Sequence, residues 1–339
     1  MPIWASHTRE FPVETLYTVF IDPFVQMVGM PDFFLQVLWE GLVSGVLYSL
    51  IALGFVLIFK SSRIFNFAQG IMVVFAALSL VGLHTFLVPF VGNEFVAAAI
   101  AMPLTLGIMY ALAMSVERVV LRPLVGQPDI ILFMATIGIT MFLIGFGEFV
   151  FGGENKVMIT EALGIPTGSI EFEPFGGFLL LEEKDVFAVV MAIVLVVSLL
   201  VFLNKSAMGR AIRALGDDHT AALSVGISLS TIWVLVWFIA GVIALATGIV
   251  WGARAGVSFA LEVIAYKALP VLMLGGLESV SGAIIGGIAI GLLEKIFEIY
   301  WGQPLFGGNT ETWFAFIFAL IVLLFRPQGL FGEKIIERV

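Results

Sequence analysis

The residue types that most often carry catalysis are scarce in this chain, and they do not form the common catalytic patterns. The 339 residues include no cysteine, which excludes thiolate nucleophiles and cysteine-based metal sites. The three histidines, His7, His84 and His219, lie far apart, and no H-E-x-x-H or G-x-S-x-G pattern occurs. No G-x-x-x-x-G-K-[ST] motif occurs either, so the chain has no P-loop for ATP. We therefore expect that it is not an enzyme, and that it holds no metal and no cofactor of its own.

Polar side chains inside long apolar segments are the remaining candidates for function. A charge at membrane depth costs about 2.5–3.5 kcal/mol on insertion scales, so each such residue calls for a functional hypothesis. The candidate pathway residues are Tyr48, Ser49, Asn66, Gln69, Glu262, Tyr266 and Lys267.

Two groups of these residues leave alternatives open. Asn66 and Gln69 are three apart on one face of an expected helix, where they either hydrogen-bond a passing substrate or join neighbouring helices. Glu262 and Tyr266 are i, i+4 neighbours, and Lys267 follows directly. Here the alternatives are a role in the pathway and a structural ion pair made by Lys267 within the bundle, with Glu262 as a candidate partner.

The elements that position these residues are membrane-spanning helices. Hydrophobic residues make up 60% of the chain, charged residues 12%, and the mean hydropathy is +1.11. A soluble domain is near 45–50% apolar and about 25% charged, so we expect an all-α integral membrane protein. A crossing needs about 20 apolar residues. The segments that meet or approach this length are 33–59, 64–83, 95–117, 129–151, 186–204, 228–252, 281–299 and 311–325.

The stretch 262–275 is shorter and contains Pro270 near its end. We expect a broken or re-entrant element near 262–282, which is tolerated only where protein or a water-filled cavity surrounds it. The total is then eight or nine crossings, depending on whether this stretch traverses fully.

The distribution of basic residues predicts the orientation. Loops rich in Lys and Arg remain in the cytoplasm. Ten of the sixteen basic residues fall on one predicted side, namely Lys60, Arg63, Arg118, Arg122, Lys205, Arg210, Arg213, Arg326, Lys334 and Arg338. The net charge of −9 and the lack of a basic stripe argue against a nucleic-acid partner.

We expect one transmembrane domain over 33–326, with an interfacial extension over 1–32 and a cytoplasmic tail over 327–339. An alternative for residues 11–30 is a further spanning helix. The acidic segment 152–185 should lie outside the membrane, either as a small cap on the outer face or as a solvated loop.

The cytoplasmic loop 205–227 has the features of a coupling segment. Asp217 is placed to cap a short helix over 216–227, and Gly226 is placed to end it. Its small-residue face would dock into a groove of another protein, or else the loop is an amphipathic connector. The candidate coupling residues are Arg210, Arg213, Asp217, Asp218, His219, Ala222 and Gly226.

Several stretches resemble, in the same order, the permeases of the branched-chain amino acid ABC transporter family. In the 205–227 loop the resemblance rests on Gly209-Arg210-Ala211, Arg213-Ala214, Asp218, Ala222 and Gly226-Ile227. Elsewhere it rests on 41–54 as the first core helix, N-F-A-Q-G at 66–70, the Gly-rich turn at 275–287 and R-P-Q-G-L-F-G at 326–332. The chain departs from the family at Ile71, where an acidic residue is frequent, and at Glu278, where a small residue is frequent. It also has no recognisable counterpart in that family for 1–32 and 152–185.

The resemblance implies a permease subunit of an ABC importer in the bacterial inner membrane. It implies a second homologous permease, two ATPase subunits that use ATP and Mg, and a periplasmic substrate-binding protein. The expected substrates are branched-chain amino acids or a related small carboxylate or amide, moved by alternating access. The alternative is a stand-alone secondary transporter or channel, which would need its own coupling-ion site; the sequence has no evident acidic cluster for one.

Overall fold

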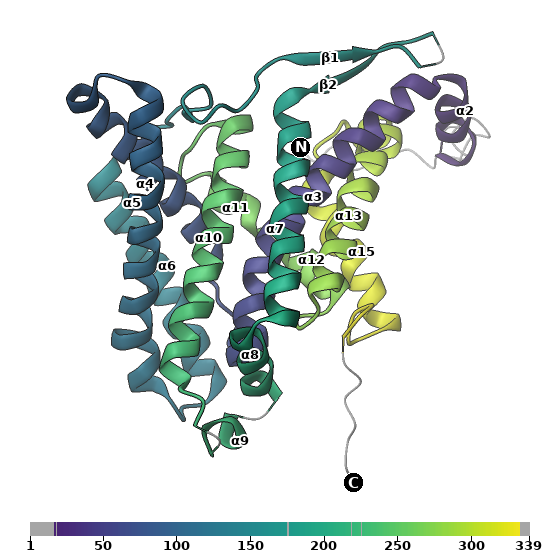
Figure 1. Ribbon diagram of the computed structural model, residues 1–339. Coiled ribbons are helices and arrows are strands. Elements are labelled where there is room, and N and C mark those ends of the chain that lie inside the picture. The colour runs from purple at the N-terminus through teal and green to yellow at the C-terminus, as the bar shows by residue number, and fades with distance from the viewer. Residues whose placement is uncertain (1–16, 18, 175, 218, 225, 333–339) are drawn as a thin grey trace, which may run out of the picture.

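The computed structural model describes residues 17, 19–174, 176–217, 219–224 and 226–332, and it shows a bundle of helices (Figure 1). In this part of the chain, seven helices are long and apolar enough to cross a membrane. The α-helical parts of the seven are α3 (Pro31–Ser62), α4 (Gln69–Val91), α5 (Glu94–Ser115), α6 (Asp129–Phe151), α7 (Glu183–Lys205), α10 (Leu229–Ala255) and α13 (Val280–Phe297). Short π, 3-10 and α turns continue two of them, namely η1 (Val116–Leu121) and η2 (Arg122–Leu124) after α5, and η3 (Glu298–Gly302) and α14 (Gln303–Phe306) after α13. The prediction of an all-α membrane protein is confirmed.

The expected break near 262–282 is also present. Residues 261–275 form two short helices, α11 (Leu261–Tyr266) and α12 (Ala268–Gly275), with Lys267 between them. The last apolar helix, α15 (Glu311–Phe325), has 15 residues, fewer than a full crossing requires. Helices of spanning length in the described residues therefore number seven, and the predicted total of eight or nine is not confirmed.

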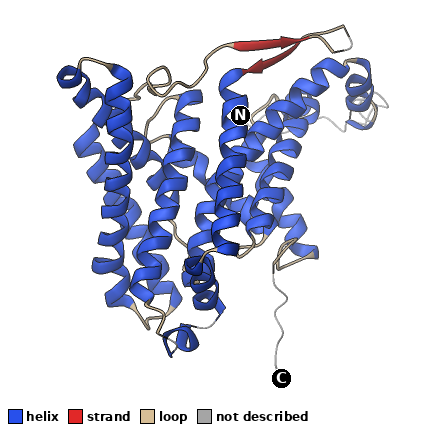
Figure 2. Cartoon of the chain, viewed as in Figure 1, coloured by secondary structure: helices blue, strands red, loops and turns tan. Residues whose placement is uncertain are grey.

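The two ends of the bundle differ as the charge distribution predicts. Two small helices, α8 (Ala207–Asp217) and α9 (His219–Ser224), lie at the end where the basic loops gather (Figure 1). The opposite end carries the antiparallel hairpin of β1 (Ser169–Phe172) and β2 (Leu179–Glu182), shown in red in Figure 2. The short helix α2 (Asp22–Gly29) also lies at this outer end, and its eight residues cannot span a membrane. Of the predicted interfacial extension, residues 1–16 and 18 lie outside the described part.

The outer segment 152–185 is a cap in its first half and an exposed hairpin in its second. Lys156 forms a β-bridge with Val257, and the side chains of Met158 and Ile165 are buried. All four residues of β1 are exposed. The hairpin is joined to the bundle where the Leu180 amide donates to Gln36 Oε1 at 3.0 Å. Both earlier alternatives thus describe part of the segment.

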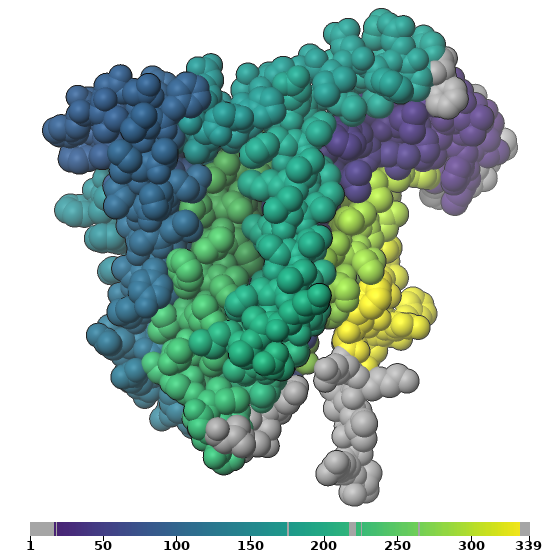
Figure 3. Space-filling view, viewed as in Figure 1, coloured from purple at the N-terminus to yellow at the C-terminus, as the bar shows by residue number. Residues whose placement is uncertain are grey.

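Helix α3 is the centre of the bundle, and its backbone touches that of α13. Every residue from 47 to 58 is buried. A Cβ added at Gly45 would meet the backbone of Gly287, and one added at Gly291 would meet the backbone of Gly45. Small residues spaced four apart allow this approach of two membrane helices. Helix α7, unlike α3, is mostly exposed. Only 22% of its most apolar 18-residue stretch is buried, and the helix lies on the front surface in Figure 3.

Candidate functional site

A cluster of charged and aromatic side chains lies between α3, α12, α13 and α15. The Lys267 ammonium donates to Glu294 Oε1 at 2.6 Å and to the Tyr48 hydroxyl at 3.2 Å. The Tyr48 hydroxyl in turn donates to Glu294 Oε1 at 3.2 Å. Glu311 lies 3.6 Å from the Lys267 Nζ and 2.5 Å from the Lys295 Nζ. Two lysines and two glutamates thus form one connected group, which we call the charged cluster.

The charged cluster lies among the membrane helices, nearer the end of the bundle that carries the β1–β2 hairpin. Tyr48 lies 14 residues from the end of α3 at Ser62, Glu294 14 residues from the start of α13 at Val280, and Glu311 14 residues from the end of α15 at Phe325, all at the predicted cytoplasmic end of the bundle. A rise of 1.5 Å per residue places all three about 21 Å from the cytoplasmic ends. The hydrocarbon core is about 30 Å thick, so about 21 Å from one edge leaves about 9 Å to the other, and the cluster lies in the half of the core nearer the β1–β2 hairpin. The Gly–Gly contacts between α3 and α13 hold Tyr48 and Glu294 together at this level.

Part of the charged cluster is open on the surface of the isolated chain. The side chains of Lys267, Lys295 and Glu311 are 22%, 23% and 28% exposed, whereas that of Glu294 is 1% exposed. Partly exposed charges at this depth would be unfavourable against lipid. The face formed by α12, α13 and α15 around the cluster is therefore expected to be covered by protein or to line an aqueous path.

Two buried polar atoms beside the charged cluster lack a hydrogen-bond partner. One is Glu294 Oε2, and the other is the indole Nε1 of Trp251, whose ring stacks on Tyr48 with centroids 6.1 Å apart. Buried polar groups normally have a hydrogen-bond partner. The free acceptor at Glu294 and the free donor at Trp251 therefore indicate that hydrogen bonds in this region can be exchanged for others.

Glu262 and Tyr266 form a separate contact. The Tyr266 hydroxyl donates to Glu262 Oε1 at 3.0 Å, as their i, i+4 spacing predicts. Lys267, by contrast, pairs with Glu294 and Glu311. Lys267 therefore makes an ion pair within the bundle, as the structural alternative predicts, but Glu262 is not its partner. Lys267 lies between α11 and α12, and its side chain is directed to helices that sequence spacing does not reveal.

Ser49, Asn66 and Gln69 have packing roles in this structure. The Ser49 hydroxyl donates to the Gly45 carbonyl at 2.8 Å, within the α3–α13 contact. Helix α4 begins at Gln69, so Asn66 precedes it and is not on the same helix face, contrary to the prediction. Its Oδ1 accepts the Ala68 amide at 3.1 Å, a local bond that competes with helix formation. Gln69 Nε2 donates to the Ala240 carbonyl at 3.4 Å and so joins α4 to α10.

Sequence reasoning missed Glu294, Lys295, Glu311 and Trp251. A signal was present: Glu294 and Lys295 are charges inside a predicted spanning segment, and such residues are uncommon there. Which lysine meets which glutamate depended on the packing of α12, α13 and α15.

The predicted coupling region lies at the end of the bundle where the basic loops gather. The guanidinium of Arg213 donates to the Leu203 carbonyl at the end of α7, and Arg210 Nη1 donates to the Lys205 carbonyl at 3.3 Å. A Cβ at Gly216 would meet the Lys60 carbonyl, so α8 packs directly under α3. Any force on α8 therefore acts on the end of the central helix.

The short helix of the coupling region is α9, and it differs in part from the prediction. Asp217 ends α8, α9 begins at His219, and Asp218 lies outside the described residues, as do the side chains of Asp217 and His219. Gly226, with φ 85°, follows the end of α9, as expected. Ala222 is 3% exposed, so it packs inside this chain and cannot enter a partner's groove. The neighbouring Leu223 is 49% exposed and takes its place as the outward-facing residue.

In the described residues, no three His, Cys, Asp or Glu side chains gather in a way that would hold a metal ion. The charged cluster alternates glutamate with lysine, and each carboxylate already has an ammonium partner. Its chemistry is that of ion pairing and hydrogen bonding, which suits the recognition or passage of a polar solute.

Comparison with known proteins gives a consistent result over almost the whole chain. Residues 37–325 match the family model described as branched-chain amino acid transport system / permease component. The high-affinity branched-chain amino acid transport system permease protein BraD of Pseudomonas aeruginosa is 29% identical over 330 residues, which cover 91% of this chain and 100% of BraD. The corresponding protein LivH of Escherichia coli K12 is 27% identical, with 91% and 98% covered. Among solved structures, PsaBC from Streptococcus pneumoniae in complex with Fab is 12% identical with a TM-score of 0.43, and the match covers 85% of this chain and 91% of that one.

Proposed function

The chain belongs to the family of permease components of branched-chain amino acid transport systems, and we propose on this premise that it carries branched-chain amino acids. It is a multi-pass membrane protein and a permease of an ABC importer. The single observation that carries the substrate proposal is the similarity to BraD and LivH along their full lengths. A related small carboxylate or amide is the neighbouring substrate class.

We propose that the complete importer contains a second homologous permease, two ATPase subunits and a periplasmic binding protein. Membership of the ABC permease family implies transporter partners, and this composition is the form we assign to them. ATP and Mg would then be used by the ATPase subunits, because this chain has no P-loop. The bacterial inner membrane is the corresponding location, as the bacterial relatives suggest.

The charged cluster supports a specific placement of the pathway. Its partly exposed lysines and glutamate need cover within the membrane, and a second permease facing α12, α13 and α15 would supply it. The substrate is a zwitterion, so Glu294 and Lys267 offer opposite charges for its two ends. Glu294 Oε2 has no hydrogen-bond partner, so the ammonium group of a passing substrate could bond to it weakly and briefly, without a tight binding site.

Coupling to the ATPases would act through α8 and α9. We propose that nucleotide binding moves α9 through its exposed residue Leu223, and that α8 passes this motion to the end of α3 beneath Lys60. Tyr48 is on the same helix, which connects the cytoplasmic event to the charged cluster.

The first test is to tag the full chain, extract its native complex in mild detergent and identify the co-purifying subunits by mass spectrometry. We expect a second permease and two P-loop ATPases. The chain alone, or only copies of itself, would remove the energy source and favour a stand-alone secondary transporter or channel.

The second test addresses the substrate. The purified complex with its binding protein is reconstituted in vesicles, and ATP-dependent uptake of labelled leucine, isoleucine and valine is measured against glutamate, lysine and urea. ATP-driven uptake that prefers another solute would keep the importer and overturn the assignment of branched-chain amino acids.

A further inference from the structure

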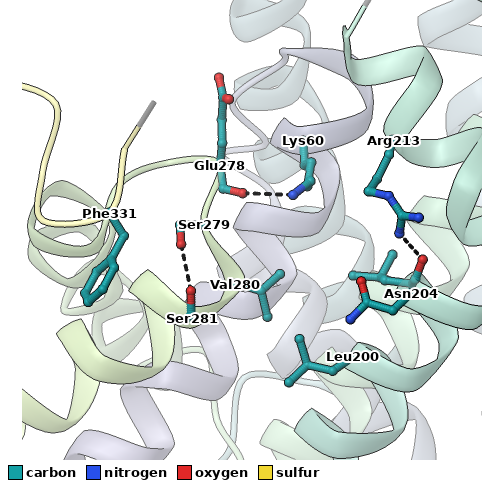
Figure 4. Close-up of a pocket in the computed structure, with 10 residues that line it drawn as sticks. Lys60, Leu200, Asn204, Arg213, Glu278, Ser279, Val280, Ser281 and Phe331 are labelled. Carbon is teal, nitrogen blue, oxygen red and sulfur yellow. Dashed lines mark hydrogen bonds between the residues drawn. The ribbon is translucent and has the colours of Figure 1, made fainter. Parts of the chain in front are cut away.

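A second polar site lies at the cytoplasmic end of the molecule, separate from the charged cluster. It is a cavity of about 240 Å³ between the ends of α3 and α7, the helix α8 and the turn that precedes α13 (Figure 4). Its lining residues are Lys60, Leu200, Leu203, Asn204, Arg213, Glu278, Ser279, Val280, Ser281 and Phe331.

Two cations of this cavity are only weakly compensated by the protein. The Lys60 ammonium has a hydrogen bond of 3.5 Å to the Glu278 carbonyl, at the limit of useful length. The Arg213 guanidinium donates from Nη1 to the Leu203 carbonyl, and its fork has further N–H groups to offer. Both residues are half-buried, so part of their hydration is lost and an anion in the cavity would be favourable.

The carboxylate that lines the cavity does not neutralise them. The Glu278 carboxylate pairs with Arg63 on the other side of the turn, and in Figure 4 its side chain points away from Lys60. Asn204 and Ser281 add neutral hydrogen-bonding groups at the rim. Among the described residues that line the cavity, the two positive charges exceed the one negative charge, and the cavity has room for several oxygen atoms.

The depth and the apolar wall indicate what kind of anion would fit. Leu200, Leu203, Val280 and Phe331 form an apolar wall next to the two cations. Lys60 lies two residues before the end of α3, and Leu200 five residues before the end of α7, which places the cavity at the level of the cytoplasmic headgroups. Helix α7 beside it is largely exposed along its length, as a lipid-facing helix would be.

We propose that this cavity binds a phosphate group, with Lys60 and Arg213 as its charged ligands. The apolar wall favours a phosphate carried on an anionic phospholipid of the cytoplasmic leaflet, and the tests below separate it from free phosphate. The residues that line the cavity come from the end of α7, from α8 and from the start of α13. A bound anion would therefore connect the coupling region to the helix that carries Glu294.

The test uses the full chain, purified in detergent and depleted of lipid. Binding of phosphatidylglycerol is measured by native mass spectrometry, with phosphatidylcholine as the lipid control and inorganic phosphate as the competitor. We expect phosphatidylglycerol to bind more tightly than phosphatidylcholine. Loss of a charge-assisted bond in Lys60→Gln should weaken phosphatidylglycerol binding by about tenfold or more.

Matched variants separate a charge effect from misfolding. Arg213→Gln removes a contact to α7 and could unfold α8, so Asn204→Asp is the second variant, because this exposed side chain adds a negative charge to the cavity without removing a bond of Arg213. Arg326→Gln is the control, since Arg326 is exposed at the same end but does not line the cavity. We expect Asn204→Asp to lose binding and Arg326→Gln to retain it.

Each outcome supports or overturns the proposal. Displacement of phosphatidylglycerol by inorganic phosphate would support the site and show that free phosphate can also fill it, whereas selective binding of phosphatidylglycerol without competition would identify the lipid as its ligand. Equal binding of both lipids, or unchanged binding of phosphatidylglycerol in both Lys60→Gln and Asn204→Asp, would overturn it.

Discussion

Replacing Lys267 by methionine removes the cation that two carboxylates share inside the membrane-spanning bundle. Its Nζ lies 2.6 Å from Glu294 and 3.6 Å from Glu311. At an effective dielectric constant near 20, these separations correspond to attractions of about 6 and about 5 kcal/mol. Desolvation of the ions offsets much of this, and breaking a buried pair by removing one partner typically costs about 3–5 kcal/mol.

We expect Lys267→Met to destabilise the full chain by about 3–5 kcal/mol, because the Glu294 carboxylate is left buried and unpaired. The double variant Lys267→Met with Glu294→Gln should recover most of that loss, since it buries no unpaired charge. Stability is measured as the free energy of unfolding in SDS mixed micelles, followed by circular dichroism.

A matched substitution shows whether the effect belongs to this pair. Lys295→Met removes a cation that contacts Glu311 and leaves Glu294 with its partner, so a smaller loss is expected. The reasoning is refuted if Lys267→Met is as stable as the wild type, or if the double variant is no more stable than the single one.

Four other substitutions give further predictions, measured by the same SDS titration and, for Leu223, also by ATP-dependent uptake. Gly291→Val places methyl groups against the α3 backbone and should destabilise the chain by about 1–3 kcal/mol. The side chain of Asp185 is 6% exposed and lies 3.1 Å from the Arg254 guanidinium. Arg254→Gln removes this cation and should lower the free energy of unfolding by about 1–3 kcal/mol. Leu223→Asp changes an exposed residue of α9, so we expect normal stability and an ATP-dependent uptake lowered by about tenfold or more. Ala222→Phe overfills a buried position and should instead lower stability by about 1–3 kcal/mol.

These predictions have controls in the same chain. Gly107→Ala adds a Cβ that meets no atom within 4 Å, so it should be neutral where Gly291→Val is not. Lys184→Gln breaks a surface pair with Glu182, which should cost less than about 1 kcal/mol. A stable, fully folded Ala222→Phe with lost uptake would contradict our packing of α9 and restore the original docking hypothesis for Ala222.

The spanning helices were predictable because each is a long apolar run with a clear stop. The predicted segment 129–151 coincides with the spanning helix α6. The segment 311–325 coincides with α15, which is shorter than a full crossing. The start of α4 was misplaced by five residues, because the side chain of Asn66 bonds to the backbone and keeps residues 66–68 out of the helix. The broken element was predictable from its length and Pro270.

The partners inside the bundle were not predictable in this way. Lys267 and Glu294 are 27 residues apart, and their meeting depends on how α12 packs on α13. Apolar periodicity carries little information here, because these helices are hydrophobic on all sides and their orientation is set by packing. The same reason explains Ala222, whose small side chain is typical of both a docking surface and a tight internal contact.

The direct contact of the α3 and α13 backbones limits how this permease can move. No side chain separates Gly45 from Gly287 and Gly291, so there is no flexible layer in which one helix could slide along the other. We expect the two helices to turn as one rigid body during transport. The bending must then occur elsewhere, and the single residue between α11 and α12 is the natural hinge. That residue is Lys267, so a change in the hinge angle would directly change the distances among the charges that we place on the substrate path.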